Sequence, residues 1–174
     1  MVKRAAMEYT LSPAARRDIK PIFLLNKEII DRYENIAKID YPKVMKIVRN
    51  GIKKHIGEYQ RIMCGNTLAG YLLVEKDTDK TELDDLFLYP EFQNMSIGTA
   101  IIQNITADSD KPVYLFVFIK NEGAVRLYKR LGFEVVETVH ETRYRMRFKA
   151  TPQKDHCPQV DVSSTPAQKV RGKA

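Results

Sequence analysis

Hydrophobic residues along this chain follow two spacings, and together they predict eleven elements. Short, strand-like apolar runs predict seven strands, at residues 7–11, 59–63, 68–74, 81–88, 113–119, 133–137 and 141–148. Apolar residues three or four positions apart predict four helices, which begin near Pro13, Pro42, Gly98 and Asn121. The resulting order, β-α-α-β-β-β-α-β-α-β-β, is that of an α/β (α+β) domain, with an antiparallel meander in the middle.

Local signals refine several of these elements. Ser12–Pro13 predicts a capped helix start, and Pro21 predicts a kink or restart in the same helix. Gly51 or Gly57 is expected to end the second helix. The uninterrupted apolar run at 113–119 is typical of a strand buried on both faces.

The composition favours one soluble domain followed by a tail. The chain has 174 residues, enough for a domain with a core, and no apolar run approaches the ~18 residues of a membrane span. The N-terminus has no apolar core of signal-peptide length, so we expect a cytoplasmic protein without a membrane partner. Residues 1–149 form the predicted domain. Residues 150–174 contain three prolines and no Ile, Leu, Phe, Tyr or Trp, which predicts disorder.

The net charge and the potential metal-ligating residues give little information about the function. The net charge of +7 suits an anionic ligand, and it leaves nucleic acid as an unlikely but open partner. The basic residues are spread along the chain, which favours solvated faces balanced by 22 acids. The two cysteines and the histidines (His55, His140 and His156) show no ligand spacing, so we predict no metal site. The sequence leaves the oligomeric state open, a homodimer included.

One segment predicts an anion site. A strand ends at Leu88, Pro90 follows, and a turn-rich loop leads into a helix that opens with small residues around Gly98. Such a loop and helix start present unpaired backbone N–H groups and a partial positive charge to one point. Phosphate is the ligand that most often occupies such a site.

Two segments resemble the GNAT superfamily of acetyl-CoA-dependent N-acetyltransferases. Gln93–Gly98 matches the family's loop pattern, and Asn121–Phe133 matches its second motif in the Asn, Ala, Leu-Tyr and Gly-Phe positions. In this sequence Asn94 and Ser96 stand where the family commonly has glycine, and Asn tolerates positive φ.

The resemblance covers residues 7 to 148. It implies a central mixed, mostly antiparallel sheet whose strands splay apart, with residues 86–88 and 113–117 framing the gap. It also implies that acetyl-CoA binds, without a metal, at Leu86, Phe87, Leu88, Gln93, Asn94, Met95, Ser96, Ile97, Gly98, Thr99, Asn121 and Tyr128.

Tyr128 is the first predicted catalytic residue. It stands at the family's Leu-Tyr position, where the tyrosine meets the departing thiolate of CoA. A hydrogen bond to that thiolate is as plausible as full proton transfer, because a thiol is the stronger acid. The alternative is a tyrosine that only packs the helix. Asn121 is expected to contact CoA, to cap the helix, or to do both.

Three acidic residues are candidates for handling the amine, which arrives protonated at neutral pH. The resemblance implies either that Glu82 is a general base, as in histone-type members, or that Asp84 and Asp85 bind the amine, as in polyamine-type members, and both cannot be assumed. Strand alternation places Asp85 on the face opposite Glu82 and Asp84, unless a bulge intervenes. Water as the base and a merely solvated acidic strand end remain alternatives.

The sequence therefore predicts an N-acetyltransferase that moves an acetyl group to a primary amine of a small molecule or a protein by direct attack. Two alternatives stay open. One is an acetyltransferase acting on RNA-linked aminoacyl groups, which the basic charge suits. The other is a regulatory module that binds CoA without catalysis, which the altered loop suits.

Overall fold

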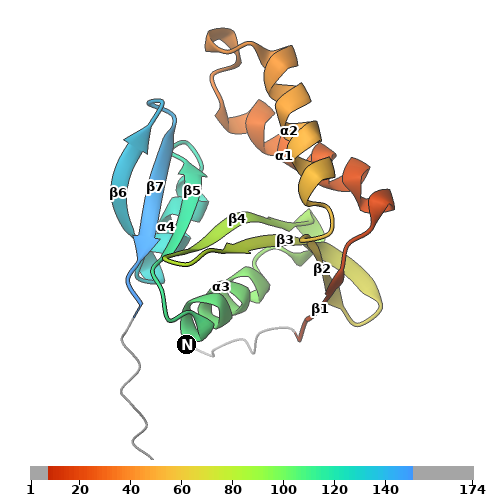
Figure 1. The fold of residues 1–174 in the computed structure, drawn as a ribbon, viewed down its shortest axis with the longest axis vertical. Coiled ribbons are helices and arrows are strands. Elements are labelled where there is room, and N and C mark those ends of the chain that lie inside the picture. The colour runs from red at the N-terminus through yellow and green to blue at the C-terminus, as the bar shows by residue number, and fades with distance from the viewer. Residues whose placement is uncertain (1–7, 151–174) are drawn as a thin grey trace, which may run out of the picture.

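A seven-stranded sheet with helices on both faces makes up the part of the chain that the computed structural model describes, residues 8–150 (Figure 1). The strands are β1 (Thr10–Pro13), β2 (Gln60–Cys64), β3 (Thr67–Lys76), β4 (Thr81–Leu88), β5 (Val113–Phe118), β6 (Glu134–Val139) and β7 (Arg143–Phe148). The helices are α1 (Ile19–Tyr33), α2 (Tyr41–His55), α3 (Ile97–Asp108) and α4 (Glu122–Arg130). The predicted element order is confirmed. The predicted tail lies outside the described residues, apart from Ala150.

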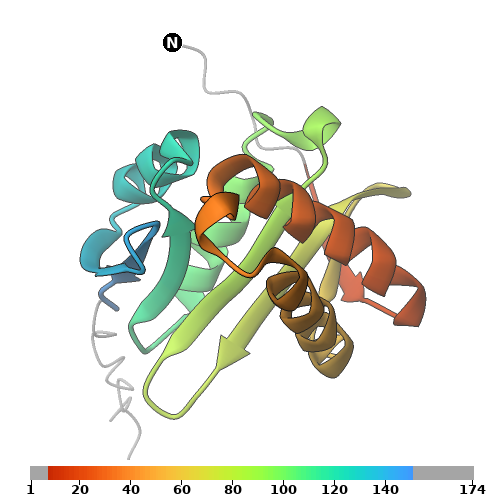
Figure 2. The same cartoon turned by 90° about the horizontal axis from the view of Figure 1, so that it is seen from above.

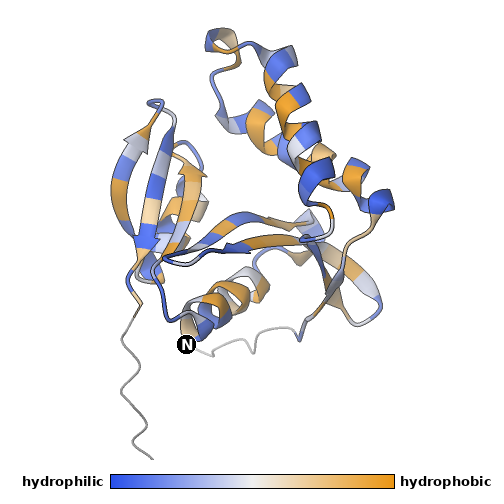
Figure 3. Ribbon diagram, viewed as in Figure 1, coloured by the Kyte–Doolittle hydropathy of each residue, from blue (hydrophilic) through white to orange (hydrophobic). Residues whose placement is uncertain are grey.

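Two hydrophobic cores fix the helices to the sheet. One core lies beneath α3 and α4 and includes Leu83, Ile101 and Met146. The other lies beneath α1 and α2 and includes Ile22 and Phe87. Figure 2 shows α1 crossing over the strands, and Figure 3 shows hydrophobic and hydrophilic residues alternating around α1 and α2, as in helices that bury one side. In residues 8–150, no helix is long and apolar enough to cross a membrane.

The sheet opens in its middle, between β4 and β5. The strand order is β1-β2-β3-β4-β5-β7-β6, and β4 and β5 pair in parallel only over Thr81–Leu83 and Val113–Leu115. Beyond these residues β4 continues beside β3 while β5 continues beside β7, so the two halves of the sheet diverge (Figure 1). The splay that the resemblance implied is confirmed. It begins later than expected, because Val113–Leu115 still belong to the paired part.

A bulge in β4 changes the direction of its acidic residues. Leu73 pairs with Asp85 and Val74 pairs with Leu83, so Asp84 is an extra residue in β4. Leu83 therefore faces α3, while Asp85, two residues later, faces α1 and α2. Glu82 shares the face of its cross-strand partner Glu75, which contacts α2. The bulge is the exception that the alternation prediction allowed for, and it turns Asp85 to the side of Glu82.

The N-terminal segment also departs from its prediction. Ser12 and Pro13 belong to β1, where Pro13 pairs with Gln60, and α1 begins only at Ile19. Proline is tolerated in β1 because this is the edge strand of the sheet. Pro21 lies in the first turn of α1, where a missing N–H breaks no helical hydrogen bond, so it causes neither a kink nor a restart.

Strand β5 is buried on one face and only partly buried on the other. Val113, Leu115 and Val117 are buried on the first face, whereas on the second Phe116 is 41% exposed and only Phe118 is buried. The prediction of burial on both faces is therefore wrong. The core beneath α1 and α2 includes residues of β3 and β4 but none of β5, so these helices leave the second face of β5 partly open.

Gly70 of β3 is essential to the shape of β4. A Cβ placed on Gly70 would lie 1.9 Å from the backbone oxygen of Phe87, near the end of β4. We expect Gly70→Ala to lower the free energy of unfolding by about 3 kcal/mol, because the clash is with backbone that cannot rotate away. Urea unfolding measures this change.

Gly51→Ala is the matched control. Gly51 lies inside α2, which ends at His55, and a Cβ there meets nothing within 4 Å. This change should raise stability by roughly 0.5–1 kcal/mol, because alanine is the better helix former. Equal stability for the two variants would contradict the assigned path of β4.

Candidate active site

A cleft of ≈ 680 Å³ opens beside the end of β4. The end of β4, the loop after it, the start of α3, α4 and one side of α1 line it. Eleven of the twelve residues predicted to bind the cofactor line this cleft: Leu86, Phe87, Leu88, Gln93, Asn94, Ser96, Ile97, Gly98, Thr99, Asn121 and Tyr128. Met95 does not line it and is 39% exposed.

The loop before α3 takes the conformation that glycines usually provide. Asn94 and Ser96 have φ values of 60° and 61°, in the left-handed region. Ser96 is the N-cap of α3, and its carbonyl accepts a hydrogen bond from Ala100 N at 2.9 Å. The Gln93 side chain donates to the Leu88 carbonyl at 2.9 Å, which ties the loop to the end of β4. The loop therefore keeps its shape without the family's glycines.

The start of α3 is open to the cleft. Its first N–H groups have no partner within the helix, and Ser96 supplies no side-chain cap. A Cβ on Gly98 would make only an ordinary 3.6 Å contact with Leu88, so packing does not require glycine there. Glycine instead leaves space beside these N–H groups. This space and the helix dipole suit a phosphate group.

Arginines add positive charge to the same cleft. Arg126 and Arg130 of α4 and Arg32 of α1 line it. Arg32 pairs with Glu28 at 2.8 Å and Arg126 pairs with Glu122 at 3.1 Å, so within residues 8–150 Arg130 is the arginine of the three without an ion pair. Sequence reasoning missed these residues. The spacing of Arg126 and Arg130, four apart on one helix, was a readable signal. Nothing in the sequence indicated that α1 would reach the cleft.

The left-handed conformation of Ser96 leads to a prediction. Serine in this region costs about 1 kcal/mol relative to glycine. We expect Ser96→Gly to raise the free energy of unfolding by up to that amount and to keep CoA binding intact. Thermal unfolding and calorimetric CoA titration measure the two effects. Weaker CoA binding by the variant would mean that the Ser96 hydroxyl itself contacts the ligand.

A second cavity, of ≈ 300 Å³, adjoins the first and is acidic at its base. Asp84 and Asp85 of β4 and Asn26 of α1 supply its polar groups, and Phe116 and Phe118 of β5 supply much of its apolar wall. Arg143 also lines it. Its guanidinium lies 3.5 Å from Glu34 and 4.3 Å from the Phe118 ring centre, so its charge is already compensated.

Asp85 is the most perturbed carboxylate of this cavity. It accepts hydrogen bonds from the Tyr59 hydroxyl and, at 3.3 Å, from the Asn26 amide. The pKa of Asp85 is raised from 3.8 to about 6, because burial, together with the smaller effect of the Asp84 charge, outweighs the two hydrogen bonds that lower it. Loss of hydration, followed by the charges of Glu75 and Glu82, also raises the pKa of Asp84. The cavity therefore favours a positively charged guest.

Glu82 lies away from this chemistry. It sits in the paired part of β4, forms an ion pair with Lys80 at 2.5 Å, and lines neither cavity. Of the three predicted acidic residues, Asp84 and Asp85 line the second cavity and Glu82 does not.

Tyr128 lies where the two cavities meet. The cavities share residues of α1, β4 and α4: Ile29, Leu86, Phe87, Asn121, Ala124 and Tyr128. Burial, with a smaller contribution from the charge of Asp85, raises the pKa of Tyr128 to about 12. Its hydroxyl is therefore neutral and able to donate a hydrogen bond at neutral pH. Asn121 caps α4, accepting from Ala124 N at 3.3 Å, and also lines both cavities.

Residues 27–133, more than half of the chain, match the Acetyltransferase (GNAT) family. The chain belongs to this family, whose members are acyltransferases that use acetyl-CoA.

Its relatives include an uncharacterised N-acetyltransferase of Methanocaldococcus jannaschii, which is 40% identical over 62 residues. That match covers 33% of this chain and only 27% of the relative.

Solved structures share the fold at low identity. The PaiA N-acetyltransferase of Thermoplasma acidophilum, in complex with coenzyme A, has a TM-score of 0.61 at 19% identity, covering 82% of this chain and 99% of that one. The spermidine N-acetyltransferase of Vibrio cholerae, in complex with CoA and spermine, has a TM-score of 0.59 at 19% identity, covering 82% and 95%. The ribosomal-protein-S18-alanine N-acetyltransferase of Escherichia coli has a TM-score of 0.57 at 16% identity, covering 86% and 98%. These neighbours act on different amines, so the fold does not select an acceptor.

Proposed function

We propose that this protein transfers an acetyl group from acetyl-CoA to a primary amine held in the acidic cavity. The observation that carries the proposal is the position of Tyr128 between the positively charged cleft and the cavity of Asp84 and Asp85. The Tyr128 hydroxyl, a hydrogen-bond donor, and the carboxylates of Asp84 and Asp85 thus lie near the junction of the two cavities. In acyl transfer from a thioester to an amine, the donor would stabilise the leaving sulfur and a carboxylate would bind the ammonium.

The larger cleft would hold acetyl-CoA. The N–H groups around Gly98 suit its pyrophosphate, and Arg130 supplies further positive charge for phosphate. Residues 86–88 of β4 offer free strand edge to the pantetheine arm, because β5 has already diverged from them. When bound, acetyl-CoA supplies the acetyl group as a thioester.

Asp85 would receive the amine. An ammonium group in water has a pKa near 10.4, so a carboxylate must attract it and then accept its proton, directly or through water. The free amine nitrogen then attacks the thioester carbonyl carbon, and the C–S bond breaks as the sulfur leaves as a thiolate. The second proton of the nitrogen passes to this thiolate through water, which gives the amide and CoA thiol. The raised pKa of Asp85 makes it a better proton acceptor than an ordinary aspartate. Asp84 adds negative charge at the same place.

Tyr128 would stabilise the departing thiolate by a hydrogen bond rather than by giving up its proton. A thiol has a pKa near 8.5, and that of Tyr128 is about 12. Full transfer of the proton from Tyr128 to sulfur would therefore be uphill by about 5 kcal/mol. A hydrogen bond to the developing charge carries no such cost.

We further propose that residues 1–149 act as one catalytic domain in the cytoplasm and that the acceptor is a small molecule or a protein amine. The test is release of CoA thiol from acetyl-CoA in the presence of diamines, amino acids, aminoglycosides and lysine peptides. At least one class should release CoA in proportion to its concentration. CoA binding without release by any amine would instead support a non-catalytic module. Acceptor binding that falls steeply with salt would point to RNA.

A further inference from the structure

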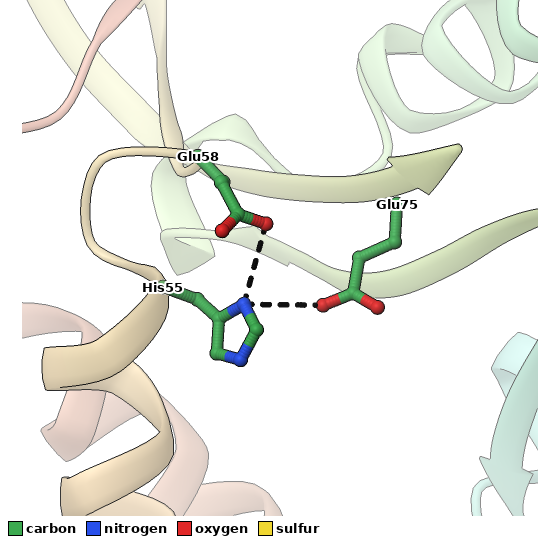
Figure 4. A group of neighbouring side chains, drawn as sticks. All are labelled: His55, Glu58 and Glu75. Atoms are coloured by element: carbon green, nitrogen blue, oxygen red, sulfur yellow. Dashed lines mark hydrogen bonds and ion pairs between the residues drawn. The ribbon is translucent and has the colours of Figure 1, made fainter. Parts of the chain in front are cut away.

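Three metal-ligating side chains meet at a site away from both cavities: His55, Glu58 and Glu75 (Figure 4). His55 is the last residue of α2, Glu58 lies in the turn after it, and Glu75 comes from β3. His55 Nδ1 lies 3.2 Å from Glu58 Oε2 and 3.3 Å from Glu75 Oε1. The three ligand atoms lie within 4.8 Å of one another. In the sequence only His55 and Glu58 are close, so His55 looked isolated from any ligand set.

The distances suit a shared metal ion. Ligands bound tetrahedrally to zinc at its usual bond lengths lie about 3.3–3.5 Å from one another. The two measured separations from Nδ1 are close to this value. Both carboxylates approach the same nitrogen, yet a neutral imidazole carries one N–H and offers Nδ1 to a single hydrogen bond. A metal ion on Nδ1 would satisfy both carboxylates at once.

The surrounding charge also favours a cation. Glu75 stands directly opposite Glu82 in the antiparallel pair, an arrangement that is destabilising without compensation. Glu82 has Lys80 as its partner, whereas the ion pairs of Glu58 and Glu75 within residues 8–150 are made with His55 alone.

We propose that His55, Glu58 and Glu75 bind one Zn²⁺ ion, with water completing a tetrahedral shell. A nitrogen and two carboxylate oxygens suit zinc, whereas magnesium prefers an octahedral shell of oxygens. None of the three ligands lines either cavity, so the ion is structural. It ties the end of α2 to β3 and so secures the helices that cover the acidic cavity.

The test is calorimetric titration of the full chain, freed of any histidine tag, with ZnCl₂ and separately with MgCl₂. The tail carries His156 and Cys157 and can add a second zinc equivalent, so the comparison between variants decides. We expect His55→Ala and Glu75→Gln each to lose one zinc equivalent that the wild type and the control Glu137→Gln retain. The titration with MgCl₂ should show no binding at this site. Identical zinc stoichiometry in all four proteins would overturn the proposal.

Two further readouts are independent of the stoichiometry. Zinc at 100 times its Kd should raise the melting temperature of the wild type by about 5–10 °C, and that of Glu75→Gln by much less. Co²⁺ in place of zinc should give the intense visible absorption of a tetrahedral complex, absent from His55→Ala. A melting temperature that zinc leaves unchanged, together with no cobalt absorption, would mean that the cluster is only an ion-pair network.

Discussion

Replacing Asp85 by asparagine is expected to make the protein more stable and nearly inactive. The rise in the pKa of Asp85 from 3.8 to about 6 corresponds to about 3 kcal/mol that the folded state loses by holding this charge. Asparagine keeps an acceptor for the Tyr59 hydroxyl and removes the charge. We therefore expect about 2 kcal/mol more stability at pH 7.5, or a melting temperature higher by roughly 4–8 °C.

The same substitution removes the group that would bind the ammonium and accept its proton. We expect kcat/KM for the amine to fall by about 100–1,000-fold while CoA affinity stays the same. Stability gained at the expense of activity is typical of functional residues. Asp108→Asn, at the exposed end of α3, is the control and should change neither property. An active Asp85→Asn variant would remove Asp85 from the mechanism.

The pH dependence follows from the direction of the shift. The folded pKa of Asp85 lies above its unfolded value, so the folded state binds the proton more tightly. Its contribution to stability is complete below pH 3.8 and is lost as the pH rises through about 6. Activity should change in the opposite sense, because kcat/KM rises as Asp85 ionises near pH 6. Urea unfolding and kcat/KM across pH 5–8 measure these effects, and both should be absent from Asp85→Asn.

Tyr128→Phe is expected to slow acetyl transfer by about 100–1,000-fold, through kcat rather than KM. The change removes one hydroxyl next to the departing sulfur and leaves the ring packed against Phe133, at a centroid distance of 5.7 Å. Stability and CoA affinity should change little. Steady-state kinetics with a good acceptor and calorimetric CoA titration separate these quantities.

Tyr114→Phe provides the control for Tyr128→Phe. Tyr114 lies in β5 beneath the Arg145 guanidinium and lines neither cavity, so its loss of a hydroxyl should leave kcat unchanged. Normal turnover in Tyr128→Phe would show that this tyrosine only packs α4. That outcome would favour the alternative stated from the sequence, in which Tyr128 has no catalytic role.

The sequence predicted the parts of the site that local chemistry determines. Gln93–Gly98 and Asn121–Phe133 carry their function in short motifs, so their places in the cleft followed from pattern and resemblance. The sequence also indicated that Asn94 tolerates a positive φ, whereas the left-handed conformation of Ser96 is seen only in the structure.

Other parts depend on contacts between distant segments. The face that Asp85 occupies is set by the bulge at Asp84, and this bulge is visible only in the register between β3 and β4. The contribution of α1 to both cavities comes from how the helix packs on the sheet. The apolar run at 113–119 gave no sign that Phe116 borders a cavity. Periodicity describes one segment at a time, so it could not supply these features.

The account rests on direct transfer between two adjoining cavities, and a single-turnover experiment tests it most directly. Excess enzyme is mixed with acetyl-CoA and the best acceptor amine, and both CoA thiol and acetylated amine are measured over time. The account predicts equal amounts of the two products, formed in one phase, and strongly slowed in Asp85→Asn and Tyr128→Phe. CoA thiol released without acetylated amine, or no release at all, would contradict it.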